Sequence, residues 1–213
     1  MPFTNIFYQS HVAQGWSDLT EIRTNPIGPN YSNSKNWLTQ FLLNTTFSAP
    51  MAANQRALEF AILRRAEGAA EDFDGAWSCL HEFLSERTCS RYFRALRKLE
   101  TVIAQVYQAF EFIRIATSKR FFEPNDNTHY ERLGKIYNIG RHGRPLNLPD
   151  GHMQLVWITN EGINIDGSRL SFDELRELVA ELAEAANKIA SGFPQPQGPA
   201  PNSSGETAAP PRS

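Results

Sequence analysis

The sequence is poor in cysteine and has no long apolar run, and both shortages narrow the class of protein. Only Cys79 and Cys89 occur among 213 residues, ten positions apart in sequence that reads as helical. That spacing fits neither a disulfide within one helix nor a zinc site. No stretch approaches eighteen apolar residues, and the N-terminal residues do not resemble a secretory signal. We therefore expect a cytoplasmic protein that has no membrane partner.

Signatures of several common enzyme classes are also missing. The chain contains no GxxxxGK[ST] phosphate loop, no GxSxG nucleophile turn and no HExxH zinc motif. Four of the histidines show no ligand spacing with cysteines or clustered carboxylates: His11, His81, His129 and His152. The sequence therefore predicts no metal site and no cofactor.

The charge is close to balanced. A formal net charge of −2 and a pI of about 6.2 exclude a surface that is basic all round, so any nucleic-acid site must be local. Hydrophobic residues make up 41% of the chain, which is enough for one sizeable core.

Composition divides the chain into three segments. Residues 1–33 carry Pro2, Pro26 and Pro29 among scattered aromatic residues, which predicts an irregular arm. Residues 34–191 have helical periodicity and form the expected domain. Residues 192–213 hold six of the 13 prolines and almost no large apolar residue, which predicts a disordered tail.

Hydrophobic periodicity predicts a mainly α fold, an up-and-down helical bundle with a small β-hairpin near the C-terminus. The apolar stripe of the fourth helix, which includes Phe93, Leu99, Val106 and Ala116, marks it as the spine of the bundle. Ser171 and Glu174 form a capping box that starts the last helix. The expected helices cover 34–49, 52–72, 74–86, 90–117, about 128–142 and 172–191, and the hairpin covers 155–165.

A polar cluster occurs on the fifth expected helix, within the stretch YERLGKIYNIGRHGRP. Lys135, Asn138 and His142 are spaced by three and four residues, so they share one helical face. The opposite face should dock on the bundle through Leu133, Ile136, Tyr137 and Gly140. The cluster is either a solvated face near a helix C-terminus or an acid–base and phosphate-binding group flanked by Arg141.

A basic stripe forms a second candidate at the start of the fourth helix. It consists of Arg87, Arg91, Arg94 and Lys98. These side chains either pair with Glu82, Glu86 and Glu100, or contact the phosphates of an RNA strand. Residues 114–144 add seven Lys or Arg against three acids, so that end of the protein is expected to be locally positive.

These residues resemble the HEPN superfamily, whose helical-bundle domains include metal-independent ribonucleases of toxin–antitoxin, phage-defence and RNA-processing systems. The resemblance covers roughly residues 53–142. The phrase LGKIYNIGRH, followed by VWITNEG and LSFDELRELVAEL, is also similar to uncharacterised HEPN-like bacterial proteins. The family's active motif is an arginine, a polar residue that is often asparagine, a few residues and then a histidine, on one late helix and paired across a dimer. Asn138 and His142 match the last two positions, whereas Tyr137 takes the place of the arginine.

The resemblance implies an RNA-acting protein, and more narrowly a metal-independent endoribonuclease in which His142 and Asn138 are catalytic. The residues expected to bind RNA are Lys135, Arg141, Arg91 and Arg94. The resemblance also implies a homodimer or a cognate protein partner. Because Tyr137 stands where the motif has arginine, a second hypothesis remains: a non-catalytic helical module that binds protein or RNA.

Overall fold

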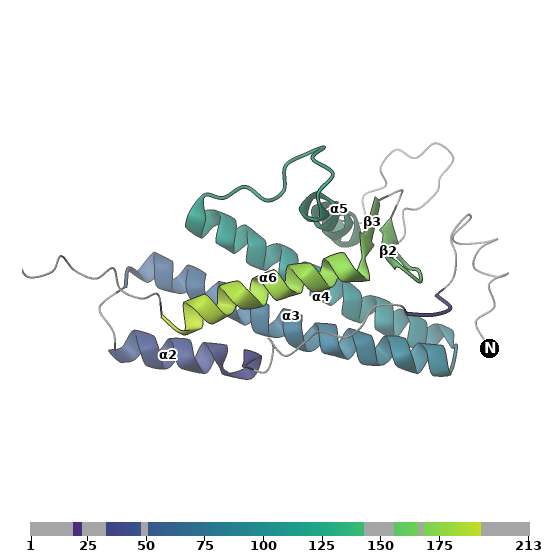
Figure 1. Cartoon of the computed structure of the whole chain (residues 1–213), viewed down its shortest axis with the longest axis horizontal. Helices are drawn as coiled ribbons and strands as arrows, with labels where there is room; N and C mark the ends of the chain where they lie inside the picture. Colours follow the sequence, from purple (N-terminus) through teal and green to yellow (C-terminus); the bar gives the residue numbers. More distant parts are fainter. Residues whose placement is uncertain (1–18, 23–32, 48–50, 143–155, 166–167, 193–213) are drawn as a thin grey trace, which may run out of the picture.

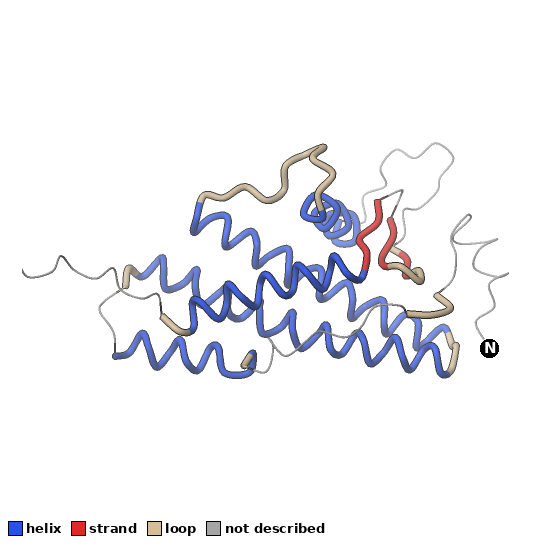
Figure 2. The backbone as a smooth tube through the Cα atoms, viewed as in Figure 1, coloured by secondary structure: helices blue, strands red, loops and turns tan. Residues whose placement is uncertain are grey.

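The structure is a computed structural model that describes residues 19–22, 33–47, 51–142, 156–165 and 168–192. It is mainly helical with one small antiparallel sheet near the C-terminal end, so the predicted fold class is confirmed. The helices form an elongated bundle, and the strands lie toward one end of it (Figures 1 and 2). The predicted arm over 1–33 and tail over 192–213 lie almost entirely outside the described residues.

Two long antiparallel helices, α3 (Ala53–Ser85) and α4 (Cys89–Thr117), form the centre of the bundle and lie side by side in Figure 1. The Thr88 hydroxyl caps α4 by accepting the backbone N–H of Arg91 at 3.4 Å. The predicted stripe on α4 is buried through Leu96, Leu99, Val102, Ile103, Val106 and Phe110. Its ends were predicted wrongly, because Phe93 is 42% exposed and Ala116 is also exposed.

The predicted break near residues 72–74 is wrong, because α3 is one continuous helix. Gly68 and Gly75 each cost about 1 kcal/mol inside a helix. Burial of the Phe73 side chain alone contributes about 1.5–3 kcal/mol, and the flanking Ala69 and Ala76 are also fully buried. Packing of α3 against α4 therefore outweighs the local preference for a turn.

Replacing Gly75 by alanine should raise the free energy of unfolding by about 0.5–1 kcal/mol, because alanine loses less backbone entropy in a helix. An added Cβ would come no closer than 3.6 Å to the Lys98 side chain, which is an ordinary contact. Urea unfolding of both proteins measures the change. Gly162→Ala is the control and should lower the free energy of unfolding, because at φ +156° its Cβ would lie 2.2 Å from the Leu170 carbonyl oxygen. A destabilised Gly75→Ala protein would contradict the continuous helix.

Helices α2 (Trp37–Phe47) and α6 (Phe172–Ala190) pack beside the central pair, and the 3-10 turn η2 (Ser34–Asn36) leads into α2. Two hydrogen bonds join them: the Trp37 indole donates to Asn187 Oδ1 at 2.6 Å, and Asn44 Nδ2 donates to the Ala190 carbonyl at 2.6 Å. The predicted capping box at the start of α6 is present, with both of its hydrogen bonds formed.

The sheet has three antiparallel strands in the order β1 (Trp157–Ile158), β2 (Gly162–Ile165) and β3 (Ser168–Ser171). The predicted hairpin is therefore confirmed, and β3 is an additional strand. The backbone N–H of Ile158 donates to the Tyr92 hydroxyl at 2.8 Å, which ties the sheet to the first turn of α4. Val156, the residue before β1, lines a pocket together with Ile103 and Ala104 near the middle of α4.

Helix α5 (His129–His142) crosses α4 and is seen nearly end on in Figure 1. It follows the predicted range closely. Phe121 and Tyr130 bury their rings against Phe110 of α4, with ring centroids 5.1 and 5.2 Å away, and so fix where α5 begins. Within the described ranges, no helix is both long enough and apolar enough to cross a membrane.

Candidate functional site

The two faces of α5 are divided as its sequence predicts. Leu133, Ile136 and Tyr137 are buried against the bundle, whereas Lys135 and Asn138 are exposed. Gly140 was expected on the docked face and is instead exposed, and it lines a pocket between α4 and α5. Arg141 is also exposed. The backbone of α5 extends through His142, whose side chain lies outside the described part of the chain.

Tyr137 is the centre of the contact between α5 and α4. Its ring stacks on Tyr107 with the centroids 4.1 Å apart and the planes 16° from parallel. Its hydroxyl accepts hydrogen bonds from Gln108 Nε2, at 3.2 Å, and from the Arg141 guanidinium, which also lies over the ring at 5.7 Å. The position where the HEPN motif has arginine therefore faces the α4–α5 interface.

Asn138 lies beside this interface while it remains exposed. Its side chain is close enough to the Tyr107 hydroxyl to influence the pKa of that group. Burial raises the pKa of Tyr107, and the nearby Glu111 carboxylate raises it further, whereas the polar Asn138 side chain lowers it. Asn138 and Arg141 are thus brought together beside the stacked tyrosine pair, Asn138 near the Tyr107 hydroxyl and Arg141 bonded to the Tyr137 hydroxyl.

Lys135 forms an ion pair within α5. Its Nζ lies 2.7 Å from the Glu131 carboxylate, which also accepts the backbone N–H groups of Asn125 and Asn127, each at 2.8 Å. The Lys135 bond and these backbone bonds lower the pKa of Glu131 to about 2 from its ordinary value of 4.5. Glu131 therefore holds the turn before α5, and Lys135 supports it.

Glu131→Gln should destabilise the protein at pH 7 and approach wild-type stability as the pH falls. A folded-state pKa below the unfolded value gives a contribution that is complete above pH 4.5 and is lost as the pH falls toward about 2. Urea unfolding of both proteins between pH 7 and pH 2 measures the difference. Glu184→Gln, an exposed substitution on α6, is the control. A difference that stays constant over this range would contradict the role of the Glu131 carboxylate.

The basic stripe is largely neutralised by acids. Arg91 lies 2.6 Å from the Glu86 carboxylate, and Arg94 lies 3.3 Å from Glu82. Lys98 pairs with Asp72 of α3 at 2.8 Å, not with Glu100. Arg94 precedes Tyr107 by 13 residues, about 20 Å of helix, so Arg91 and Arg94 lie far from the Asn138 cluster.

The cations of the segment 114–141 are mostly paired as well. Their carboxylate partners are Glu111 for Arg114, Glu123 for Arg120, Glu174 for Arg132 and Glu131 for Lys135. Of the described cations in this segment, only Lys119 and Arg141 lack a carboxylate, and each contacts an aromatic ring. The expected local positive charge is therefore mostly balanced among the described residues.

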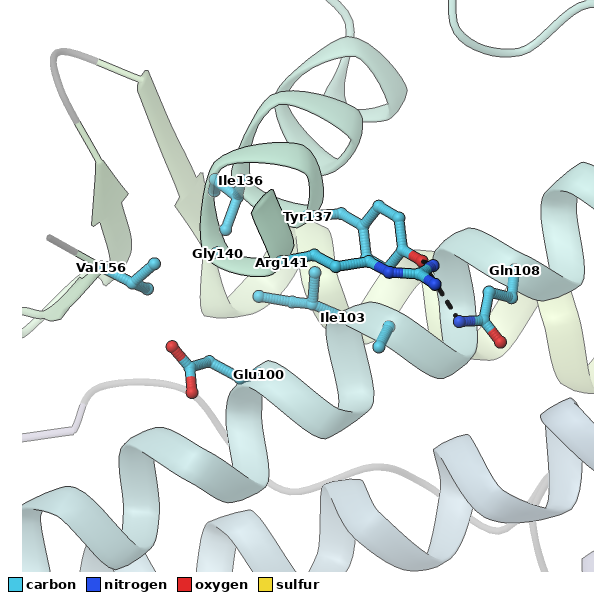
Figure 3. A pocket seen from close by; sticks show the side chains of 9 residues that line it. Glu100, Ile103, Gln108, Ile136, Tyr137, Gly140, Arg141 and Val156 are labelled. Atoms are coloured by element: carbon cyan, nitrogen blue, oxygen red, sulfur yellow. Dashed lines mark hydrogen bonds between the residues drawn. The ribbon is translucent and has the colours of Figure 1, made fainter. Parts of the chain in front are cut away.

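A pocket of about 280 Å³ lies in the groove between α4 and α5 and is bounded by Val156. Figure 3 shows Glu100 on the side next to Val156 and the Arg141 guanidinium on the side next to Gln108, with Ile103 between them. Burial raises the pKa of the Glu100 carboxyl. The sequence did not predict that Glu100 lines a pocket. Its position four residues after Leu96, on the apolar side of α4, could have indicated that it is partly buried.

No group of three or more His, Cys, Asp or Glu side chains that could hold a metal ion occurs among the described residues. Cys79 and Cys89 are half-buried and lie on two different helices, α3 and α4. Searches against protein-family models, curated proteins and solved structures found no match to this chain. The HEPN resemblance, the homodimer and the catalytic roles of Asn138 and His142 therefore stay predictions.

Proposed function

We propose that this chain is a non-catalytic, HEPN-like helical module that acts by binding a partner protein. The observation that carries the proposal is the burial of Tyr137, which stands in the arginine position and is only 8% exposed. Metal-independent cleavage needs a cation to hold the scissile phosphate. A tyrosine bonded to Gln108 and Arg141 across a helix interface does not supply one.

The charge distribution favours a protein partner over RNA. Binding of a nucleic-acid backbone depends on lysines and arginines that are free to neutralise phosphates. Three of the four residues expected to bind RNA are instead paired with carboxylates, namely Lys135, Arg91 and Arg94. The fourth, Arg141, donates to the Tyr137 hydroxyl and, among the described residues of α5, is a single cation with no second one free to extend a phosphate-binding surface. A net charge of −2 adds no long-range attraction for RNA.

An apolar groove, separate from the pocket between α4 and α5, provides a surface that could contact a partner protein. It has a volume of about 460 Å³ and lies where the start of α3 meets the ends of α4 and α6. Its apolar lining includes Leu58, Ile113, Ile115 and Ile189, and Ile115 is 55% exposed. Exposed apolar side chains beside a polar rim are typical of a groove that receives a helix of a partner.

Photo-crosslinking in the native cell tests the proposal. A photoreactive amino acid replaces Ile115 in the groove, Asn138 on α5, or Arg97, an exposed control position on α4. We expect one discrete protein adduct at position 115 and none at position 97. RNA adducts at position 138 without a protein adduct at position 115 would contradict the proposal.

The captured protein, once purified, gives the quantitative test. Ile115→Asp should weaken its binding at least tenfold, because a carboxylate would be buried in an apolar contact. Phe93→Asp is the matched control, since Phe93 is 42% exposed and lies 22 residues away along α4, about 33 Å. Equal losses in the two variants would show that the groove is not the contact.

The ribonuclease remains a second candidate because of one specific arrangement. Asn138 and Arg141 are both exposed and lie within one turn of α5, and Arg141 lacks a carboxylate partner among the described residues. A substrate phosphate could compete with the Tyr137 hydroxyl for the Arg141 guanidinium, which has five N–H donors. Incubation of the purified chain with RNA in EDTA decides between the two candidates.

A further inference from the structure

The pocket between α4 and α5 has an apolar middle with a charged group on each side. Ile103 and Ala104 of α4 face Ile136 of α5 across it, and Val156 bounds one end. Its volume of about 280 Å³ suits a molecule smaller than a drug-sized ligand. A ligand with an aliphatic middle would displace water from these walls.

Glu100 supplies the negative end. It is half-buried and has no hydrogen-bond or ion-pair partner among the described residues. Nearby basic residues of α4 do not reach it, because Lys98 pairs with Asp72 and Arg97 donates to the Phe93 carbonyl. A carboxylate that is partly removed from water without a counter-ion favours a cationic ligand.

Arg141 supplies the positive end. Its guanidinium has five N–H donors and uses one of them in the bond to the Tyr137 hydroxyl. Gln108 donates to the same hydroxyl at 3.2 Å. The turn of α4 that carries Gln108 lies eight residues after Glu100, about 12 Å along the helix. The two charged groups are therefore held apart, on opposite sides of the pocket in Figure 3.

We propose that this pocket binds a small zwitterion, an ω-amino acid whose ammonium group meets Glu100 and whose carboxylate meets Arg141. A chain of about five methylene groups, with a hydrogen bond of about 3 Å at each end, is similar in length to the stretch of α4 from Glu100 to Gln108, which shares the Tyr137 hydroxyl with Arg141. The aliphatic chain lies over Ile103, Ala104 and Ile136. This site is independent of the proposed protein contact at the groove that contains Ile115.

Calorimetric titration of the full chain with 6-aminohexanoate tests the proposal. We expect a Kd on the order of 0.1–1 mM, the range for a small ligand held by two charged contacts. Hexylamine and hexanoate, each of which has only one charged end, should bind at least about tenfold more weakly. No binding of 6-aminohexanoate at 10 times that concentration, or equal binding of hexylamine, overturns the proposal.

Three variants place the ligand in this pocket. Glu100→Gln removes the negative end with little change of shape and should weaken 6-aminohexanoate binding at least about tenfold. Gly140→Leu should abolish binding by filling the pocket, and its Cβ would meet only Val156, at 3.7 Å, so the fold is expected to tolerate it. Glu184→Gln, on α6, should bind like wild type. Circular dichroism verifies that each variant is folded, and unchanged affinity in Glu100→Gln and Gly140→Leu overturns the proposal.

Discussion

Tyr137→Arg is expected to lower the free energy of unfolding by about 2–4 kcal/mol and not to create an active site. The substitution removes the stacking on Tyr107, which contributes about 0.5–1.5 kcal/mol beyond burial. It also places a guanidinium in a position that is only 8% exposed and next to the cation of Arg141. Urea unfolding followed by circular dichroism measures the loss.

Tyr137→Phe is the matched control for this prediction. It keeps the ring and removes only the hydroxyl that accepts from Gln108 and Arg141, so it should cost about 0.5–1.5 kcal/mol. A Tyr137→Arg protein as stable as wild type would show that position 137 is open to the surface. In that case a cation could be restored there to hold a scissile phosphate, and burial at position 137 would not exclude cleavage.

Leu99→Ala should lower the free energy of unfolding by about 2–5 kcal/mol, because it leaves a cavity in the buried core of the bundle. Leu99 is fully buried on α4. Leu42→Ala, at a position on α2 that is 52% exposed, is the matched control and should change stability by less than about 0.5 kcal/mol. Thermal and urea unfolding measure both variants, and similar losses in the two would contradict the burial pattern of α4.

The sequence predicted the elements that have strong periodicity. The stripe through Leu99 and Val106 identified α4, and the capping box at Ser171 located the start of α6 within one residue. The faces of α5 were also predictable, because Leu133 and Tyr137 repeat at helical spacing. In each case one segment of sequence contained the whole signal.

The features that depend on contacts between distant segments were not predictable in this way. The continuity of α3 through Gly68 and Gly75 comes from its packing on α4, which local propensity does not contain. Strand β3 has one large apolar residue, Leu170, and gains its order by pairing with β2. Short strands of this kind have little period-2 signal.

The candidate site shows the same division. Helical spacing predicted that Lys135 and Asn138 are exposed. It did not predict which residues they contact. Whether Arg141 would turn toward solvent or toward Tyr137 depended on the position of α4. The pocket lined by Glu100 exists only because α4 and α5 meet there, so neither segment alone could predict it.

RNA cleavage is the measurement that most directly tests whether this chain is a binding module. The purified full chain is incubated with mixed cellular RNA in EDTA, beside His142→Ala and Asn138→Ala, and fragment ends are mapped. We expect all three proteins to leave the RNA as it is in a protein-free control, because Tyr137 is buried where the HEPN motif needs an arginine. Cleavage by the wild type that falls by about two to four powers of ten in His142→Ala would contradict the proposal and establish the ribonuclease.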